Sequence, residues 1–279
     1  MDEYARINNR YWDERVQAHA ASPDYAVARF ADDPQFLSGV VRYDLPRLGD
    51  LSGLDLVHLQ CHIGTDTVSL ARLGARVTGV DLSAPALEEA RRLADAAGVQ
   101  ASFVQSELYD APRTLGDARF DMVYTGIGAL CWLPDIRRWG AVVAALLRPG
   151  GRLHIREGHP VLWSLADVRA DDPRLLIEHP YFETAEGQVW DDGEVGLTYV
   201  QTDQVFQTTV THEWNHGLAE IVTALLDAGM EVTRLEEHDS VPWEALPGHM
   251  TRLDGGEWQL TDRPERLPHS YTLQARRAG

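Results

Sequence analysis

Apolar and polar positions along residues 51–160 fall into two alternating patterns. Short, continuous apolar runs bounded by turns are typical of buried strands, whereas an apolar residue every three or four positions is typical of a helix with one buried face. The sequence therefore predicts strands and helices in alternation. The strands predicted in this region are 54–60, 75–80, 101–105, 120–125 and 152–156.

Capping and turn residues mark the ends of the predicted helices. Residues 64–66 offer a turn and an N-cap for the first helix, and Ser83 with Pro85 in the next turn begins the second. A third helix, 135–147, ends at the Arg-Pro-Gly-Gly turn of 148–151. Each helix thus leads from one predicted strand to another.

Strands separated by helices of this length pair in parallel through right-handed crossovers, which predicts a Rossmann-like, doubly wound α/β sheet. A helix at 217–228 and strands at 231–237 and 270–275 extend the sheet to about seven strands. Ligands of such sheets bind at the carboxyl ends of the strands. The positions at those ends are Gly64, Asp81, Glu107, Thr125 and 157–160.

Two segments depart from this alternation. Residues 2–50 are predicted to form two or three helical pieces interrupted at Pro23 and Pro34. Residues 198–210 are rich in β-branched and aromatic side chains, which predicts an antiparallel hairpin inserted after the fifth strand. We therefore expect an N-terminal helical segment at 1–50 and a main domain at 51–279, with an insertion at about 160–216.

Charge and composition exclude several classes of function. The net charge is −18 and no basic cluster exceeds a doublet, so nucleic acid is not an expected partner. The 25 basic residues are all arginine. P-loop NTPases, protein kinases and pyridoxal phosphate enzymes need a lysine, so these three classes are excluded.

Apolar runs and cysteines bear on location. No run approaches the roughly 20 apolar residues that span a bilayer, so no membrane segment is expected. The N-terminus is polar and charged and does not resemble a signal peptide. Cys61 and Cys131 are too few for a disulfide framework, which favours a reducing cytoplasm.

Three segments carry a family resemblance: VHLQCHIGTDTVSLARLGARVTGVDLS (57–83), FDMVYTGIGALCWLPD (120–135) and LLRPGGRLHI (146–155). They resemble class I S-adenosylmethionine (SAM)-dependent methyltransferases, in particular a bacterial branch whose first loop reads H-L-Q-C-H-x-G-x-D-T. The resemblance is weaker at 181–183, at 213–230 and in the last strand. It implies SAM as the cofactor, an antiparallel last strand and an N-terminal helical cap over the cofactor.

The first loop departs from the common pattern of an acidic residue two positions before G-x-G-x-G. His58, Gln60 and His62 stand at three of these positions, and only Gly64 is kept. The Gln60 carbonyl can still bond the SAM amino group, and a helix N-terminus at 65–66 can face its carboxylate. The resemblance implies that Asp81 binds the ribose hydroxyls and that 106–108 hold the adenine. The residues implied in cofactor binding are Tyr11, Trp12, Gln60, Cys61, His62, Gly64, Asp81, Leu82, Ser106, Glu107, Leu108, Thr125 and Gly126.

Aromatic and histidine residues outside the loops supply the remaining candidates. An aromatic face attracts cations, so Tyr11 or Trp12 could cover the sulfonium, although Trp12 could instead anchor an amphipathic helix. A base is needed only if the acceptor loses a proton. His159 could serve as that base; alternatively, it packs in the structure or positions the substrate. We expect no metal, because His212, Glu213 and His216 follow no known ligand spacing. The residues expected to line the acceptor pocket are Trp163, Tyr181, Phe182, Trp214 and His216.

The sequence therefore predicts a SAM-dependent methyltransferase that methylates O, N or S of a small organic molecule. A non-catalytic or regulatory SAM-binding protein is the main alternative, because the glycine loop is altered. An RNA methyltransferase fits the acidic charge poorly. A nicotinamide-dependent oxidoreductase could also use Asp81 for a ribose, but its G-x-G-x-x-G loop is missing. The acceptor and the oligomeric state stay open.

Overall fold

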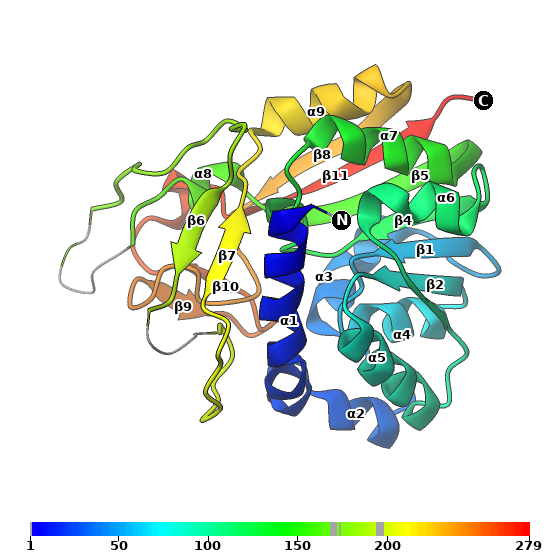
Figure 1. Ribbon diagram of the computed structural model, residues 1–279, viewed down its shortest axis with the longest axis horizontal. Coiled ribbons are helices and arrows are strands. Elements are labelled where there is room, and N and C mark those ends of the chain that lie inside the picture. Colours follow the sequence, from blue (N-terminus) through cyan, green and yellow to red (C-terminus); the bar gives the residue numbers. More distant parts are fainter. Residues whose placement is uncertain (1, 168–171, 173, 194–197) are drawn as a thin grey trace.

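A seven-stranded sheet forms the centre of the computed structural model, which describes residues 2–167, 172, 174–193 and 198–279 (Figure 1). The strand order is β3-β2-β1-β4-β5-β11-β8. Strands β3 to β5 are mutually parallel, and β11 is antiparallel to both of its neighbours, which confirms the predicted fold. The strands are β1 Asp55–Leu59, β2 Arg76–Asp81, β3 Ser102–Gln105, β4 Phe120–Thr125, β5 Leu147–Gly158, β8 Met230–His238 and β11 Ser270–Arg277.

Alternate side chains of each central strand enter two separate apolar layers. Val57 and Leu59 pack with the layer beneath α7 and α9, whereas Leu56 packs with the layer beneath α3 and α4. Because an apolar layer covers each face of these strands, both sets of alternate side chains are apolar. The strands therefore appear in the sequence as continuous apolar runs. The helices against the sheet are α3 Gly39–Leu48, α4 Thr65–Arg72, α5 Ala84–Ala96, α6 Ala111–Leu115, α7 Ile136–Leu146 and α9 Leu218–Asp227.

The N-terminal segment is helical, with breaks at both predicted prolines. It contains α1 Glu3–Ala21, α2 Val27–Asp32 and α3. Helix α1 contacts both α5 and β7, and so connects the sheet domain to the insertion (Figure 1).

The inserted hairpin is present within the predicted insertion, but of its strands only Val210 falls in the run 198–210 that suggested it. They are β6 Gln188–Asp191 and β7 Val210–Glu213, so most of 198–210 is an irregular connection. The β-branched and aromatic residues of this connection pack against a helix instead of pairing, since Val200 and Phe206 form a cluster with Ala18 of α1. Residues 168–171, 173 and 194–197 of the insertion lie outside the described residues.

Several short elements complete the fold. A second antiparallel pair, β9 Met250–Arg252 with β10 Trp258–Leu260, was not predicted. Helix α8, Pro160–Trp163, follows β5 directly. Three short 3-10 turns lie at Leu108–Asp110, Leu130–Trp132 and Pro264–Arg266.

Candidate cofactor and acceptor site

The loop between β1 and α4 has an unusual backbone. Gln60 and His62 have φ angles of 54° and 48°, and Gly64 has a φ of 80°. A Cβ added to Gly64 would lie 2.7 Å from the Cβ of Ala90 in α5, so only glycine fits there. The loop thus keeps its left-handed turns although two of its glycines are replaced.

Asp81 holds this loop from the end of β2. Its Oδ2 accepts the His62 N–H at 2.8 Å, and its Oδ1 accepts the Ser83 N–H at 2.9 Å. Burial raises the pKa of the Asp81 carboxyl despite these backbone donors. The Ser83 hydroxyl donates to Asp13 of α1 at 2.6 Å, which brings the cap helix to the same place.

Two buried oxygens at the ends of β1 and β4 have no hydrogen-bond partner within the described part of the chain. They are Oε1 of Gln60 and Oγ1 of Thr125. The Gln60 amide nitrogen donates to the Ala129 carbonyl at 2.9 Å, so the orientation of the side chain is fixed. Buried acceptors without partners are rare in folded proteins. These two fit a ligand that carries a donor or a positive charge, such as the amino acid portion of SAM.

The loop after β3 lies beside the loop after β2. The Ser106 N–H donates to the Asp81 carbonyl at 3.0 Å, and the Gln105 amide donates to the Leu82 carbonyl at 3.0 Å. Leu108 is buried in the main core cluster, and burial raises the pKa of the Glu107 carboxyl. The residues expected around the ribose and the adenine are therefore neighbours.

Helix α1 places Trp12 over the first loop. The Trp12 ring meets the rings of His62 and Trp132 edge to face, at centroid distances of 5.6 and 5.0 Å. Tyr11 instead faces the insertion, where its hydroxyl donates to Asp192 at 3.2 Å and the Arg15 guanidinium covers its ring. Trp12 is thus in contact with the predicted cofactor loop through His62.

A buried histidine pair joins α1, the first loop and the insertion. His19 Nδ1 lies 2.9 Å from His62 Nε2, and His19 Nε2 lies 2.8 Å from Thr198 Oγ1. Burial lowers the pKa of His19 to about 2 and that of His62 to about 4, so both rings are neutral. His19 could not be singled out from the sequence, because no motif surrounds it.

His159 is the N-cap of α8, and both of its ring nitrogens are engaged. Nδ1 accepts the Val161 N–H at 3.2 Å, and Nε2 lies 2.8 Å from a carboxylate oxygen of Glu237. Burial lowers the pKa of this imidazole, and Glu237 opposes the shift. To act as a base, His159 would have to release one of these contacts, so its catalytic role stays a prediction.

Three of the five residues expected in the acceptor pocket line one small cavity behind the loop after β4. Trp163, Trp214 and His216 line it together with Glu157 and Tyr271. Its volume of about 10 Å³ is room for a single water molecule. Trp214 Nε1 and the Tyr271 hydroxyl are buried without a described partner.

The other two predicted residues lie apart from this cavity. Phe182 is 66% exposed. The Tyr181 hydroxyl accepts the Leu218 N–H at 3.3 Å at the start of α9. The structure therefore places Trp163, Trp214 and His216 at the cavity, Tyr181 at the start of α9 and Phe182 at the surface.

Glu157 is a residue of this region that the sequence did not single out. Its two carboxylate oxygens accept the backbone N–H groups of four residues and so fix the loop after β4. The donors are Gly128, Ala129, Leu130 and Gly158, at 2.6 to 2.9 Å.

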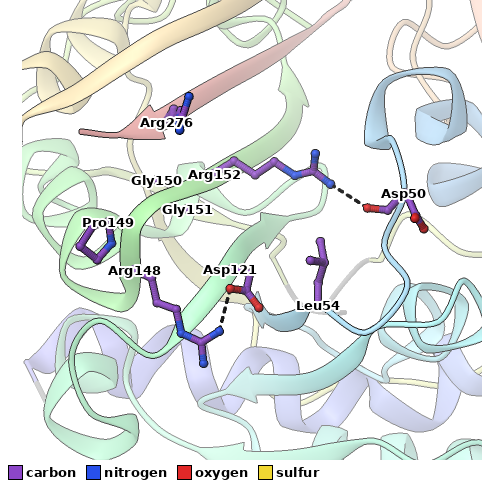
Figure 2. Close-up of a pocket in the computed structure, with 9 residues that line it drawn as sticks. All are labelled: Asp50, Leu54, Asp121, Arg148, Pro149, Gly150, Gly151, Arg152 and Arg276. Carbon is purple, nitrogen blue, oxygen red and sulfur yellow. Dashed lines mark hydrogen bonds and ion pairs between the residues drawn. The ribbon is translucent and has the colours of Figure 1, made fainter. Parts of the chain in front are cut away.

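The largest cavity we describe lies at the opposite edge of the sheet (Figure 2). Its volume is about 470 Å³, and none of the predicted cofactor residues lines it. Two of its arginines already have partners: Arg148 pairs with Asp55 and Asp121, and Arg152 donates to the Leu48 carbonyl. It lies at the amino ends of β1 and β4, away from the edge where such sheets bind ligands.

The described residues contain neither a metal-binding cluster nor a membrane-spanning helix. No group of three or more His, Cys, Asp or Glu side chains there could hold a metal ion. No helix in the same residues is long and apolar enough to cross a membrane.

Sequence comparison supplies the family. Residues 57–151 match the family described as a methyltransferase domain. The methyltransferase phqN of Penicillium fellutanum is 25% identical over 264 residues, which cover 88% of this chain and 72% of that protein. The ubiquinone biosynthesis O-methyltransferase of Xanthomonas oryzae is 31% identical over 180 residues, and the match covers 61% of this chain and 66% of that enzyme.

Solved structures agree on the fold. An S-adenosylmethionine dependent methyltransferase from Mesorhizobium loti aligns with a TM-score of 0.59 and 21% identity, covering 88% of this chain and 100% of that one. The CcbJ methyltransferase from Streptomyces caelestis aligns with a TM-score of 0.60 and 16% identity, covering 97% and 98%. Residues 57–151 therefore belong to a methyltransferase domain family, and the fold is that of SAM-dependent methyltransferases.

Proposed function

We propose that this protein transfers the methyl group of SAM to a heteroatom of a small organic molecule. The observation that carries the proposal is the meeting of the β1, β2, β3 and β4 loops beneath Trp12. Two buried oxygens without a described partner, Gln60 Oε1 and Thr125 Oγ1, lie at the ends of β1 and β4. The names of the matched relatives support a small acceptor, and the ubiquinone enzymes favour oxygen among O, N and S.

The residues of the chain have positioning roles in this proposal. When bound, SAM supplies a methyl group on a sulfonium that is already activated for in-line displacement. Asp81 holds the ribose, 106–108 hold the adenine, and Gln60 with Thr125 hold the amino acid portion. Trp12 covers the site and excludes water, which strengthens the electrostatic contacts beneath it.

The acidic surface supports a small acceptor over RNA, since the net charge is −18. The unpaired thiols of Cys61 and Cys131 support a reducing, cytoplasmic setting, and the arginine-only composition fits a bacterial gene. The altered first loop favours one second candidate, a SAM-binding protein that does not catalyse transfer.

An acceptor screen separates the two candidates. Purified protein is incubated with SAM and with sets of phenols, amines and thiols, and the release of S-adenosylhomocysteine is measured by mass spectrometry. We expect the wild type to release S-adenosylhomocysteine with the phenol set and the Asp81→Ala variant to release none. SAM binding without turnover in any set would favour the non-catalytic candidate. His159→Ala, tested with the best acceptor, should lower turnover more than SAM affinity if His159 is the base.

A further inference from the structure

Three arginines line the cavity at the amino ends of β1 and β4 (Figure 2). Arg148 and Arg152 belong to β5, and Arg276 belongs to β11. The acidic side chains of the lining are Asp50 and Asp121. Three arginines against two aspartates leave one positive charge on the walls, although the net charge of the whole chain is −18. The cavity is therefore a basic feature of an acidic protein.

The Arg276 side chain has no partner among the described residues. It is exposed, and no dashed line joins it to another residue in Figure 2. Its Nη2 and Nε would lie 3.5 and 4.0 Å from a Cβ added to Gly150, so the guanidinium lies over the turn that forms the cavity wall. Glu231 is opposite Arg276 in β8, but the described side chains form no ion pair there.

Arg152 is opposite Arg276 on the other side, in β5. Residues paired in this way have their side chains on the same face of the sheet, where like charges repel each other. Arg152 donates to the carbonyl oxygens of Leu48 and Asp50, at 2.8 and 3.3 Å. It forms no ion pair with a carboxylate in the part of the chain that the structure describes. The two opposed positive charges are therefore not neutralised by the protein.

The carboxylates at this edge of the sheet are engaged elsewhere. Asp55 and Asp121 pair with Arg148 at 2.8 and 2.7 Å. Asp121 also accepts the Asp55 N–H at 2.8 Å, and Asp50 accepts the Ser52 N–H at 2.9 Å. One arginine of the cavity thus has its opposite charge in the chain, and the other two are left for an anion from outside.

The size and chemistry of the cavity indicate the kind of anion. Its volume of about 470 Å³ is in the range of small-molecule sites. Guanidinium groups bind carboxylate and phosphate oxygens through charge-assisted hydrogen bonds. A carboxylate has two oxygens in one plane and suits a single guanidinium, whereas a phosphate presents at least three acceptor oxygens in different directions. Because Arg152 and Arg276 come from different strands, the arrangement favours a phosphate.

We propose that this cavity binds a small phosphate-bearing anion through Arg152 and Arg276. The anion supplies the negative charge that these two arginines lack. None of the predicted cofactor residues lines the cavity, so this site is separate from the strand-end site. The inference therefore goes beyond the proposed function and does not depend on it.

Calorimetry with inorganic pyrophosphate tests the site, at low ionic strength because salt screens exposed charges. For Arg276→Gln we expect the affinity to fall about tenfold, since a charge-assisted hydrogen bond is lost. Arg252→Gln is the matched control, because it removes an exposed arginine of β9 that lies outside the cavity. Its affinity should stay within about twofold of wild type. Equal affinity of wild type and Arg276→Gln, or a wild type that does not bind pyrophosphate, would overturn the proposal.

Competition with S-adenosylhomocysteine separates this site from the cofactor site. We expect saturating S-adenosylhomocysteine to leave the pyrophosphate affinity unchanged, and Arg276→Gln to leave the S-adenosylhomocysteine affinity unchanged. If S-adenosylhomocysteine displaced pyrophosphate, the anion would occupy the cofactor site and the proposal would be wrong. If pyrophosphate bound in an Arg276-dependent way and S-adenosylhomocysteine did not bind, the proposed function would fail and the anion site would stand.

Discussion

Glycine positions in the candidate site differ in what a side chain would meet. Gly64 and Gly98 both have positive φ angles, 80° and 64°, but only Gly64 faces a neighbour, the Cβ of Ala90. A left-handed conformation costs an alanine roughly 1–2 kcal/mol, and crowding in a packed core adds about 1–3 kcal/mol. The glycines at 60 and 62 are replaced on the same turn. Gly64 is therefore the position of this turn that requires glycine.

We therefore expect Gly64→Ala to lower the free energy of unfolding by about 1–3 kcal/mol more than Gly98→Ala. Urea unfolding followed by circular dichroism measures both variants. Equal losses of unfolding free energy in the two variants would mean that α5 can move away from the loop at no energetic cost.

The partly buried charge of Asp66 makes stability depend on pH. Its folded pKa, about 6, is above the ordinary value of 3.8, so folding penalises the charged form. The penalty is absent below the unfolded value and fully present above the folded one. It is at most about 3 kcal/mol at about 1.4 kcal/mol per pKa unit.

Asp66→Asn should therefore stabilise the ligand-free protein above pH 6 and have little effect near pH 4. Thermal unfolding of wild type and variant at pH 4, 6 and 7.5 measures the difference. If the variant were less stable than wild type at pH 7.5, the Asp66 carboxylate would have a compensating partner in the folded protein.

At the scale of elements, α1 is attached to the insertion by side-chain bonds on one face. The Asn8 amide donates to the His212 carbonyl at 2.7 Å and accepts the His212 N–H at 2.8 Å. Glu14 accepts the N–H groups of Gln207 and Thr208 at 2.8 and 3.0 Å. The cap and β7 are therefore expected to open together.

Asn8→Ala leaves two backbone groups of β7 without partners, at about 1–3 kcal/mol for a buried group. We expect faster hydrogen exchange in both α1 and β7, measured by mass spectrometry. Arg6→Ala changes an exposed residue of the same helix and is the control. Exchange that increases in α1 alone would contradict a shared opening unit.

The sequence predicted elements best where one local rule was sufficient. Continuous apolar runs located the parallel strands, and Ser83 was recognised as the cap before the helix that begins at Ala84. The hairpin strands were misplaced because Val200 and Phe206 obtain their burial from α1, a contact that no local pattern records. Asp66 was recognised as part of a turn, but its approach to Gly126 depends on how β1 and β4 pair.

For the whole molecule, the central claim is that the strand-end site binds the adenosyl cofactor although its first loop has lost two glycines. The sheet order, the aromatic cap and the unpaired oxygens would all be explained by this one ligand. A nicotinamide cofactor would satisfy only the ribose contact at Asp81.

Titration calorimetry of the wild-type protein with SAM, S-adenosylhomocysteine and NAD tests this claim most directly. Both adenosyl ligands should bind in the micromolar range, about −8 kcal/mol, and NAD should give no heat of binding. If neither adenosyl ligand bound, or if NAD bound with equal strength, the assignment of the cofactor would be contradicted.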